Sequence, residues 1–160
     1  MRVSVFVLDF SYDVEDNVPE IYIWGIDENG NRVVIIEKTF RPYFYVLPKD
    51  GTNLKQISEQ IRALSKQQSP ITQISEKEMK YFGTPLKVLR VETVIPVFVR
   101  TYREEIAKIN GVKEVLEADI RFYMRYSIDT NVRPFFWITA EVDEIKREGA
   151  AQESIANCIF

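Results

Sequence analysis

Apolar and polar residues alternate along the first part of the chain in a way that is typical of β-strands. Residues 2–10 place apolar side chains at every second position, and residues 20–26 and 32–38 repeat this two-residue period. The latter two stretches flank an Asn29-Gly30 step, which is a strong signal for a hairpin. The acidic stretch 11–19 lacks the pattern, so we expect a loop there.

The middle of the chain mixes helical and strand periods. Between residues 54 and 64 apolar positions recur at helical spacing, behind Thr52 or Asn53 as the N-cap. A second helix is expected at 98–109, ending before Gly111. The other expected elements are strands at 40–47, 71–79, 85–93, 112–117 and 135–142, and a helix or helical turn at 120–128.

This order predicts an α+β fold with mixed or antiparallel sheets and two or three packed helices. From Phe40 to Glu117 the order is strand–helix–strand–strand–helix–strand, a split βαβ element of the RNA-recognition or ferredoxin-like kind. Pro42 interrupts the first of these strands. Because proline cannot donate to a sheet ladder, we expect this strand to lie at an edge of the sheet or to contain a bulge.

The composition narrows the possible chemistry. A chain of 160 residues suits one compact domain. The absence of histidine removes the commonest general base and the commonest metal ligand, and we expect no cofactor and no metal site. The single cysteine, Cys158, excludes an internal disulfide. There is no long apolar run and no signal peptide, so we expect a cytoplasmic protein without a membrane span.

The net charge of −3 is distributed unevenly. Residues 1–50 carry five lysines and arginines against nine acidic residues, and residues 136–160 carry two against five. Residues 51–135 carry fourteen basic against ten acidic residues. A locally basic face can follow a phosphate backbone even in an acidic protein, so the charge permits nucleic-acid binding without arguing for it.

Three segments combine aromatic residues, arginines and a break in regular structure. They are residues 39–46, 94–103 and 119–126. A pocket for an unstacked nucleobase needs such a combination, since it requires apolar walls, aromatic faces and cations for the adjoining phosphates. The competing interpretation is an edge strand followed by two amphipathic helices that simply pack in the core.

The same segments resemble the N-terminal domain of archaeal family B DNA polymerases. The similarity covers residues 1–130, with the order and spacing of five motifs kept. The motifs are Leu8-Asp9-Phe10-Ser11-Tyr12, Thr39-Phe40-Arg41-Pro42-Tyr43, Phe82-Gly83-Thr84-Pro85, Pro96 to Arg103, and Glu117 to Asp129. Five motifs in register form a specific signal, whereas a single short motif is only a hypothesis.

The resemblance implies a pocket that captures uracil, and also hypoxanthine, in the template strand ahead of the polymerase site. The matched pocket positions are Tyr12, Pro42, Tyr43, Pro96, Val99, Ile120 and Phe122, and the matched phosphate contacts or pocket braces are Arg103 and Arg125. Arg121 is a further candidate for a phosphate contact or pocket brace. In this interpretation Tyr43, stiffened by Pro42, and Val99 form the wall against the thymine methyl group. Arg121 departs from the family, which often has proline there.

The resemblance also implies a division of the chain and a set of partners. Residues 1–135 form the base-recognition domain, and residues 136–160 form a last strand and a tail that leads toward an exonuclease domain. The implied partners are single-stranded template DNA, the exonuclease and polymerase domains, and other replisome subunits. The carboxylate motifs of polymerase and exonuclease sites (Asp-Thr-Asp, Asp-x-x-Ser-Leu-Tyr-Pro and Asp-Ile-Glu) do not occur in the sequence. We therefore expect no catalysis by this chain alone.

Two alternatives of another class stay open. The α+β topology is similar to that of RNA-recognition folds, which bind single-stranded RNA by stacking bases on a sheet. The aromatic-and-glycine motif of those folds is missing here, which counts against this alternative. The second alternative is a structural domain with a degenerate pocket, an interpretation that Arg121 permits.

Overall fold

The structure is a computed structural model of the chain, and it describes residues 1–148 and 151–156. It confirms the expected α+β class, with three α-helices and two sheets among the described residues. The contacts divide the chain into two compact units. Unit 1 joins Met1–Phe40 to Arg121–Phe160, and unit 2 consists of Arg41–Ile120. In the described ranges, no helix is long and apolar enough to cross a membrane.

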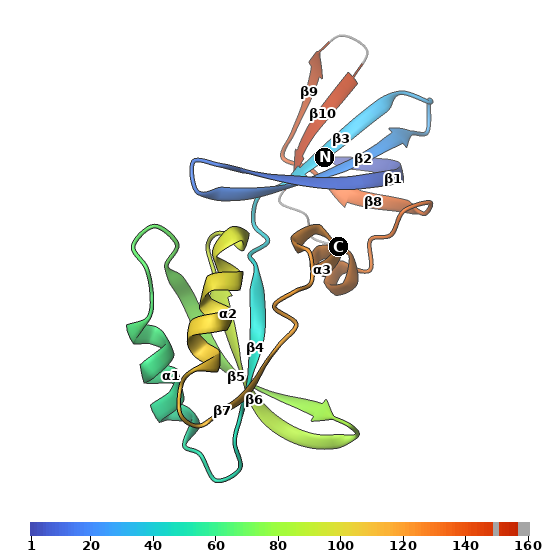
Figure 1. Ribbon diagram of the computed structural model, residues 1–160. Helices are drawn as coiled ribbons and strands as arrows, with labels where there is room; N and C mark the ends of the chain where they lie inside the picture. The colour runs from blue at the N-terminus through green and yellow to red at the C-terminus, as the bar shows by residue number, and fades with distance from the viewer. Residues whose placement is uncertain (149–150, 157–160) are drawn as a thin grey trace. The chain divides into compact units, whose positions relative to one another are not determined.

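Unit 1 is built on a six-stranded sheet with the order β8-β1-β2-β3-β10-β9 (Figure 1). Its neighbouring strands are antiparallel except for the pair β3 and β10, which is parallel. The elements are β1 (Arg2–Glu15), β2 (Val18–Asp27), β3 (Arg32–Glu37), α3 (Phe122–Thr130), β8 (Trp137–Glu141), β9 (Glu144–Glu148) and β10 (Ala151–Ala156).

The prediction of a loop at residues 11–19 is wrong. Strand β1 continues to Glu15, and β2 begins only three residues later. Asp16 and Asn17 connect the two strands with φ angles of 48° and 62°. Asp and Asn tolerate this left-handed conformation, and two such residues form the turn that best matches the twist of a hairpin. The acidic side chains therefore belong to the solvated end of a hairpin.

The core of unit 1 lies on one face of its sheet. Strands β1, β2 and β3 direct every second side chain toward α3, which contributes Phe122 and Tyr126. The strand residues in this core are Val5, Val7, Phe10, Ile21, Ile23, Val33 and Ile35. This arrangement leaves the opposite face of β1 and β2 outside the core.

Unit 2 has a four-stranded antiparallel sheet with the order β5-β6-β4-β7, which confirms the split βαβ element. The one-turn 3₁₀-helix η1 leads directly into α2. The elements are β4 (Tyr43–Pro48), α1 (Leu54–Ala63), β5 (Ile71–Tyr81), β6 (Thr84–Thr93), η1 (Pro96–Phe98), α2 (Val99–Ala107) and β7 (Val112–Leu116). As expected, Asn53 caps α1, and its side chain accepts a hydrogen bond from the Lys55 N–H at 2.9 Å.

Both α1 and α2 pack on one face of the unit 2 sheet (Figure 1). Ile57 and Ile61 of α1 and Tyr102 and Ile106 of α2 share a core with β4 and β6. The expected edge position of the Pro42 strand is wrong, because β4 lies between β6 and β7. Proline is tolerated because it precedes the first residue of β4; the expected bulge does occur, but beside Leu47.

Candidate nucleic-acid interface

The residues predicted to form the base pocket are divided between the two units. Unit 1 carries Tyr12, Arg121, Phe122 and Arg125. Unit 2 carries Pro42, Tyr43, Pro96, Val99, Arg103 and Ile120.

In unit 1, an aromatic group gathers around Phe122 at the start of α3. The Tyr12 and Phe122 rings meet edge to face with centroids 5.5 Å apart, and Phe40 lies at the same distance from Phe122. Phe40 also contacts Tyr126 at 5.2 Å. Phe122 is buried, whereas Tyr12 remains 42 % exposed. Tyr12 thus presents a partly open ring held against a buried one, which is suitable for stacking a base.

The two predicted arginines of unit 1 lie in different environments. Arg121 occupies the N-cap position of α3 without a side-chain capping bond. It is exposed, and its guanidinium donates a hydrogen bond to the Tyr123 hydroxyl at 3.3 Å. Arg125 is only 7 % exposed and lies 3.8 Å from the carboxylate of Asp129, one turn further along α3. A buried, paired guanidinium favours a bracing role for Arg125, whereas the exposed Arg121 remains available to a phosphate.

In unit 2, Tyr43 is held in place by its neighbours. The carbonyl oxygen of Pro42 accepts a hydrogen bond from the Thr93 N–H at 2.9 Å, which anchors the start of β4. The guanidinium of Arg90 lies 3.9 Å from the centroid of the Tyr43 ring, and the Tyr45 ring lies 5.6 Å away. These two contacts limit the motion of the Tyr43 ring. Sequence reasoning missed Arg90, because only the register of β4 and β6 brings it beside Tyr43.

The segment from Pro96 to Arg103 forms one continuous helical run. Pro96 begins η1, and its carbonyl oxygen accepts a hydrogen bond from the Val99 N–H. Val99 is 8 % exposed and belongs to the unit 2 core, whereas Arg103 is exposed one turn further along. Ile120 is half-buried at the boundary between the units along the chain. Val99 therefore packs in the core of unit 2. This is the alternative interpretation of the segment, in which an amphipathic helix simply packs in the core.

Unit 1 also holds a hydrogen-bonded cluster of charged and polar groups around Glu20. The Glu20 side chain is buried and binds Lys38 Nζ at 2.6 Å and the Tyr22 hydroxyl at 2.7 Å. Burial opposes ionisation, but the hydrogen bonds from Lys38 and Tyr22 outweigh it and lower the pKa of Glu20. Burial, together with Glu20 and the nearby Asp13 and Glu15, raises the pKa of Tyr22 to about 12.

This cluster predicts a loss of stability at high pH. Since the pKa of Tyr22 rises from 10.0 in the unfolded chain to about 12 in the folded one, its contribution is complete below pH 10 and is lost as the pH rises toward 12. We expect the urea midpoint to fall between these pH values more steeply for the parent chain than for Tyr22→Phe. Equal slopes for the two proteins would contradict this assignment.

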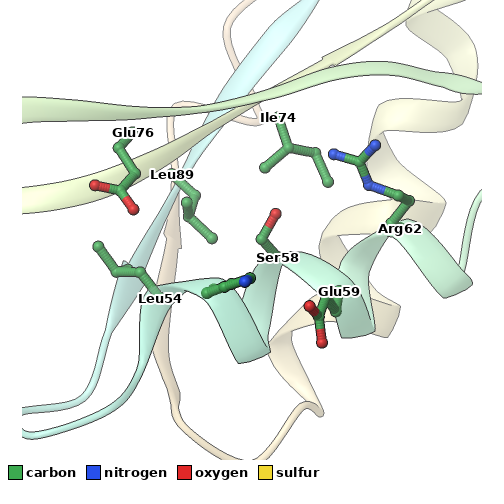
Figure 2. Close-up of a pocket in the computed structure, with 8 residues that line it drawn as sticks. Leu54, Ser58, Glu59, Arg62, Ile74, Glu76 and Leu89 are labelled. Carbon is green, nitrogen blue, oxygen red and sulfur yellow. The ribbon is translucent and has the colours of Figure 1, made fainter.

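A separate hollow of about 440 Å³ lies between α1 and strands β5 and β6 of unit 2. Figure 2 shows the Ser58 hydroxyl pointing from α1 toward the strands, with Glu76 and Arg62 at opposite ends of the hollow. It contains none of the residues predicted to hold a base. Within the described part of the chain, no group of three or more acidic, histidine or cysteine residues could hold a metal ion.

Comparison with known proteins agrees with the resemblance found in the sequence. The chain is 46 % identical over 144 residues to DNA polymerase 3 of Saccharolobus shibatae, a match that covers 90 % of this chain and 18 % of that polymerase. It is 42 % identical over 142 residues to DNA polymerase 2 of Aeropyrum pernix, covering 89 % of this chain and 18 % of that polymerase. The chain thus spans about a fifth of the length of these relatives.

A solved structure shows the same relationship in three dimensions. The family B DNA polymerase from the hyperthermophilic archaeon Pyrobaculum calidifontis superposes with a TM-score of 0.83 at 34 % identity. The match covers 99 % of this chain and 20 % of that polymerase. No family model matches the chain. In sequence and in fold, the chain belongs to the archaeal family B DNA polymerases and corresponds to their N-terminal region.

Proposed function

We propose that the chain is a non-catalytic domain that binds single-stranded template DNA and captures deaminated bases, uracil and hypoxanthine. The observation that carries this proposal is the Tyr12–Phe122 pair, in which a partly exposed ring is fixed against a buried one. Both residues are pocket positions that the sequence resemblance to this polymerase family implies. The rest of a polymerase chain supplies synthesis and proofreading, and it is the natural partner of this domain.

Capture of uracil requires rejection of thymine, which differs by one methyl group. Attraction to a single methyl group changes the binding free energy by only about 1–3 kcal/mol. A rigid wall that excludes the methyl group therefore discriminates uracil from thymine better than attraction does. Tyr43 suits such a wall, because Arg90 and Tyr45 restrict its ring. Val99 belongs to the core of unit 2 together with Phe44, on the helix-covered face of the sheet, so we assign the wall to Tyr43.

The remaining predicted site residues are arginines, whose positive charge suits contact with single-stranded DNA. Arg103 and Arg121 are exposed and can meet phosphates, while Arg125 holds α3 through Asp129. A flipped base loses little stacking in a template that is already single-stranded, and stacking on an aromatic ring returns about 1–3 kcal/mol. Tyr12 is the residue of unit 1 that we assign to this stacking.

Fluorescence anisotropy with three labelled single-stranded DNA oligomers tests the proposal. The oligomers differ only by thymine, uracil or hypoxanthine at one position, and the salt concentration is held constant. We expect uracil and hypoxanthine to bind roughly tenfold more tightly than thymine, since a difference of 1.4 kcal/mol is tenfold. Tyr12→Ala should remove this preference, because it deletes the exposed ring.

The matched control is Phe82→Ala, which deletes an even more exposed ring on the turn between β5 and β6. Phe82→Ala should keep the preference for uracil. Thermal unfolding of both variants establishes that each remains folded. Equal affinity of the parent chain for the three oligomers would support a structural domain with a degenerate pocket.

A single-stranded RNA-binding module is the second candidate. One observation favours it: the helices of unit 2 cover one face of the split βαβ sheet, while the Tyr43 and Tyr45 rings and Arg90 belong to the other face. RNA-recognition folds stack bases on such a face. Tighter binding of an RNA oligomer than of the matched thymine DNA, with no preference for uracil over thymine in DNA, would select this candidate.

A further inference from the structure

The sheet of unit 1 has an outer face, which points away from its core and from α3. The strand register identifies this face, because Val5, Val7, Ile21 and Ile23 lie in the core and their neighbours along each strand face the other way. Phe6 is paired with Ile26 of β2 and with Trp137 of β8. The outer face of β1, β2 and β8 comprises Phe6, Asp9, Ser11, Asp13, Glu20, Tyr22, Trp24, Ile26 and Trp137.

Aromatic rings with fixed orientations occupy the centre of the outer face. Tyr22 and Trp24 are stacked, with centroids 6.1 Å apart and ring planes at 25°. The Trp24 indole N–H donates to Ser11 Oγ at 2.8 Å, which fixes the ring. Phe6 and Trp137 form a second pair at 5.6 Å. Trp24 is 46 % exposed and Trp137 is 56 % exposed, so these rings form an apolar surface of the kind that marks an interaction site.

Carboxylates gather at one end of this surface. Asp9 lies opposite Trp24 in the register of β1 and β2, and Asp13 lies opposite Glu20. The side chains of Asp9 and Asp13 each accept the N–H of the following residue, at 2.8 Å and 2.7 Å. Neither takes part in a salt bridge within the described ranges.

Among the side chains that the structure describes, the cations beside β1, β2 and β8 do not neutralise this end. Lys38 is bound to Glu20 at 2.6 Å, and Arg2 is bound to Glu141 at 3.3 Å. Arg32 is paired with Ile26, toward the end of the sheet that is remote from Asp13. The surface therefore combines open aromatic rings with uncompensated carboxylates.

We propose that this outer face binds an extended, lysine- and arginine-rich segment of a partner protein, with basic side chains over the Trp24 ring and against Asp9 and Asp13. Cations are attracted to the face of an indole ring, and the neighbouring carboxylates complete the attraction. The site differs from the residues assigned to base capture, since Tyr12 and Phe122 lie on the inner face with the core of unit 1.

The charge argues against two other occupants. Nucleic-acid phosphates would be repelled by the carboxylates of Asp9 and Asp13. A second copy of this chain, related by twofold symmetry, would bring the same carboxylates of both copies to one interface. A basic protein segment is the partner whose charge complements the face.

The two tryptophans of the chain both lie on the outer face, so their intrinsic fluorescence reports directly on its occupancy. The probe is an unlabelled nonapeptide that alternates lysine or arginine with serine, titrated into the full 160-residue chain at low salt. An otherwise identical peptide with glutamate in place of every basic residue is the control. We expect a saturable change in tryptophan fluorescence with the basic peptide alone, weakening as salt is added.

The double substitution Asp9→Asn and Asp13→Asn tests the carboxylates, because asparagine preserves both shape and the hydrogen bonds to the backbone. We expect at least a tenfold increase in the dissociation constant of the basic peptide. The matched control, Glu59→Gln with Glu104→Gln, removes the same charge from exposed positions of unit 2 and should change it less than twofold.

Several outcomes would overturn the proposal. One is the absence of a fluorescence response to the basic peptide, and another is an unchanged dissociation constant in the Asp9 and Asp13 variant. A stronger response to a single-stranded DNA oligomer than to the peptide would assign the face to nucleic acid. A dimer in analytical ultracentrifugation that is broken by Trp24→Ala would assign it to a second copy.

Discussion

Gly25→Ala is expected to lower the free energy of unfolding of unit 1 by about 3 kcal/mol, at the upper end of what overpacking usually costs. A Cβ atom at Gly25 would lie 2.3 Å from Val5 Cγ1 and 2.4 Å from the carbonyl oxygen of Phe6. Val5 can change its rotamer, but the Phe6 oxygen belongs to the backbone of β1 and can move only with the strand. The pairing of β1 with β2 would therefore be distorted at its centre.

Urea unfolding monitored by tryptophan fluorescence measures this effect, since both tryptophans belong to unit 1. Gly30→Ala is the control: its φ angle of +80° strains alanine, but no atom lies within 4 Å of the new Cβ. We expect that control to cost about 1 kcal/mol, the usual penalty of a left-handed alanine. A loss at Gly25 no larger than at Gly30 would show that β1 relaxes without strain.

The same substitution bears on base capture. Tyr12 lies on β1, and its contact with Phe122 depends on the position of that strand relative to α3. Gly25→Ala should therefore reduce the preference for uracil under conditions where the protein is still folded, although Gly25 is not assigned to the site.

Tyr102→Phe is expected to destabilise unit 2 by about 3 kcal/mol, because it leaves two buried or partly buried backbone groups without a partner. Tyr102 is fully buried in α2. Its hydroxyl donates to the Ser69 carbonyl oxygen at 2.5 Å and accepts the Lys66 N–H at 2.8 Å. The hydroxyl thereby ties the loop between α1 and β5 to α2.

Far-UV circular dichroism suits this measurement, because α1 and α2 both belong to unit 2. Tyr81→Phe is the matched control, since it removes a hydroxyl that bonds to Glu114 at 3.2 Å at an exposed position. That control should change the free energy of unfolding by less than about 0.5 kcal/mol. If the two substitutions had equal effects, the buried hydrogen bonds of Tyr102 would contribute nothing.

Tyr102→Phe should also affect the predicted base site. Pro96, Val99 and Arg103 lie on the helical run that contains Tyr102. We expect discrimination between uracil and thymine to decline in Tyr102→Phe as α2 loosens.

The amino-acid sequence was sufficient to predict the family, the fold class and most of the local elements. Period-two alternation and Asn-Gly or Phe-Gly turns locate strands, and the cap at Asn53 locates α1, because these signals depend on neighbours along the chain. The order of elements was enough to predict the split βαβ of unit 2. Five motifs in the order and spacing of that family led to the polymerase family that the comparisons confirm.

Contacts between distant parts of the chain establish which residues of different strands share a face and which side chains are buried. Alternation shows that Tyr22 and Trp24 share a side of β2. Only the strand register places Asp9 opposite Trp24 and Trp137 opposite Phe6 on the same face. Burial separates Val99 from Arg103, although both lie on one helical run. Such facts depend on contacts between residues far apart in the chain, and local propensity carries no information about them.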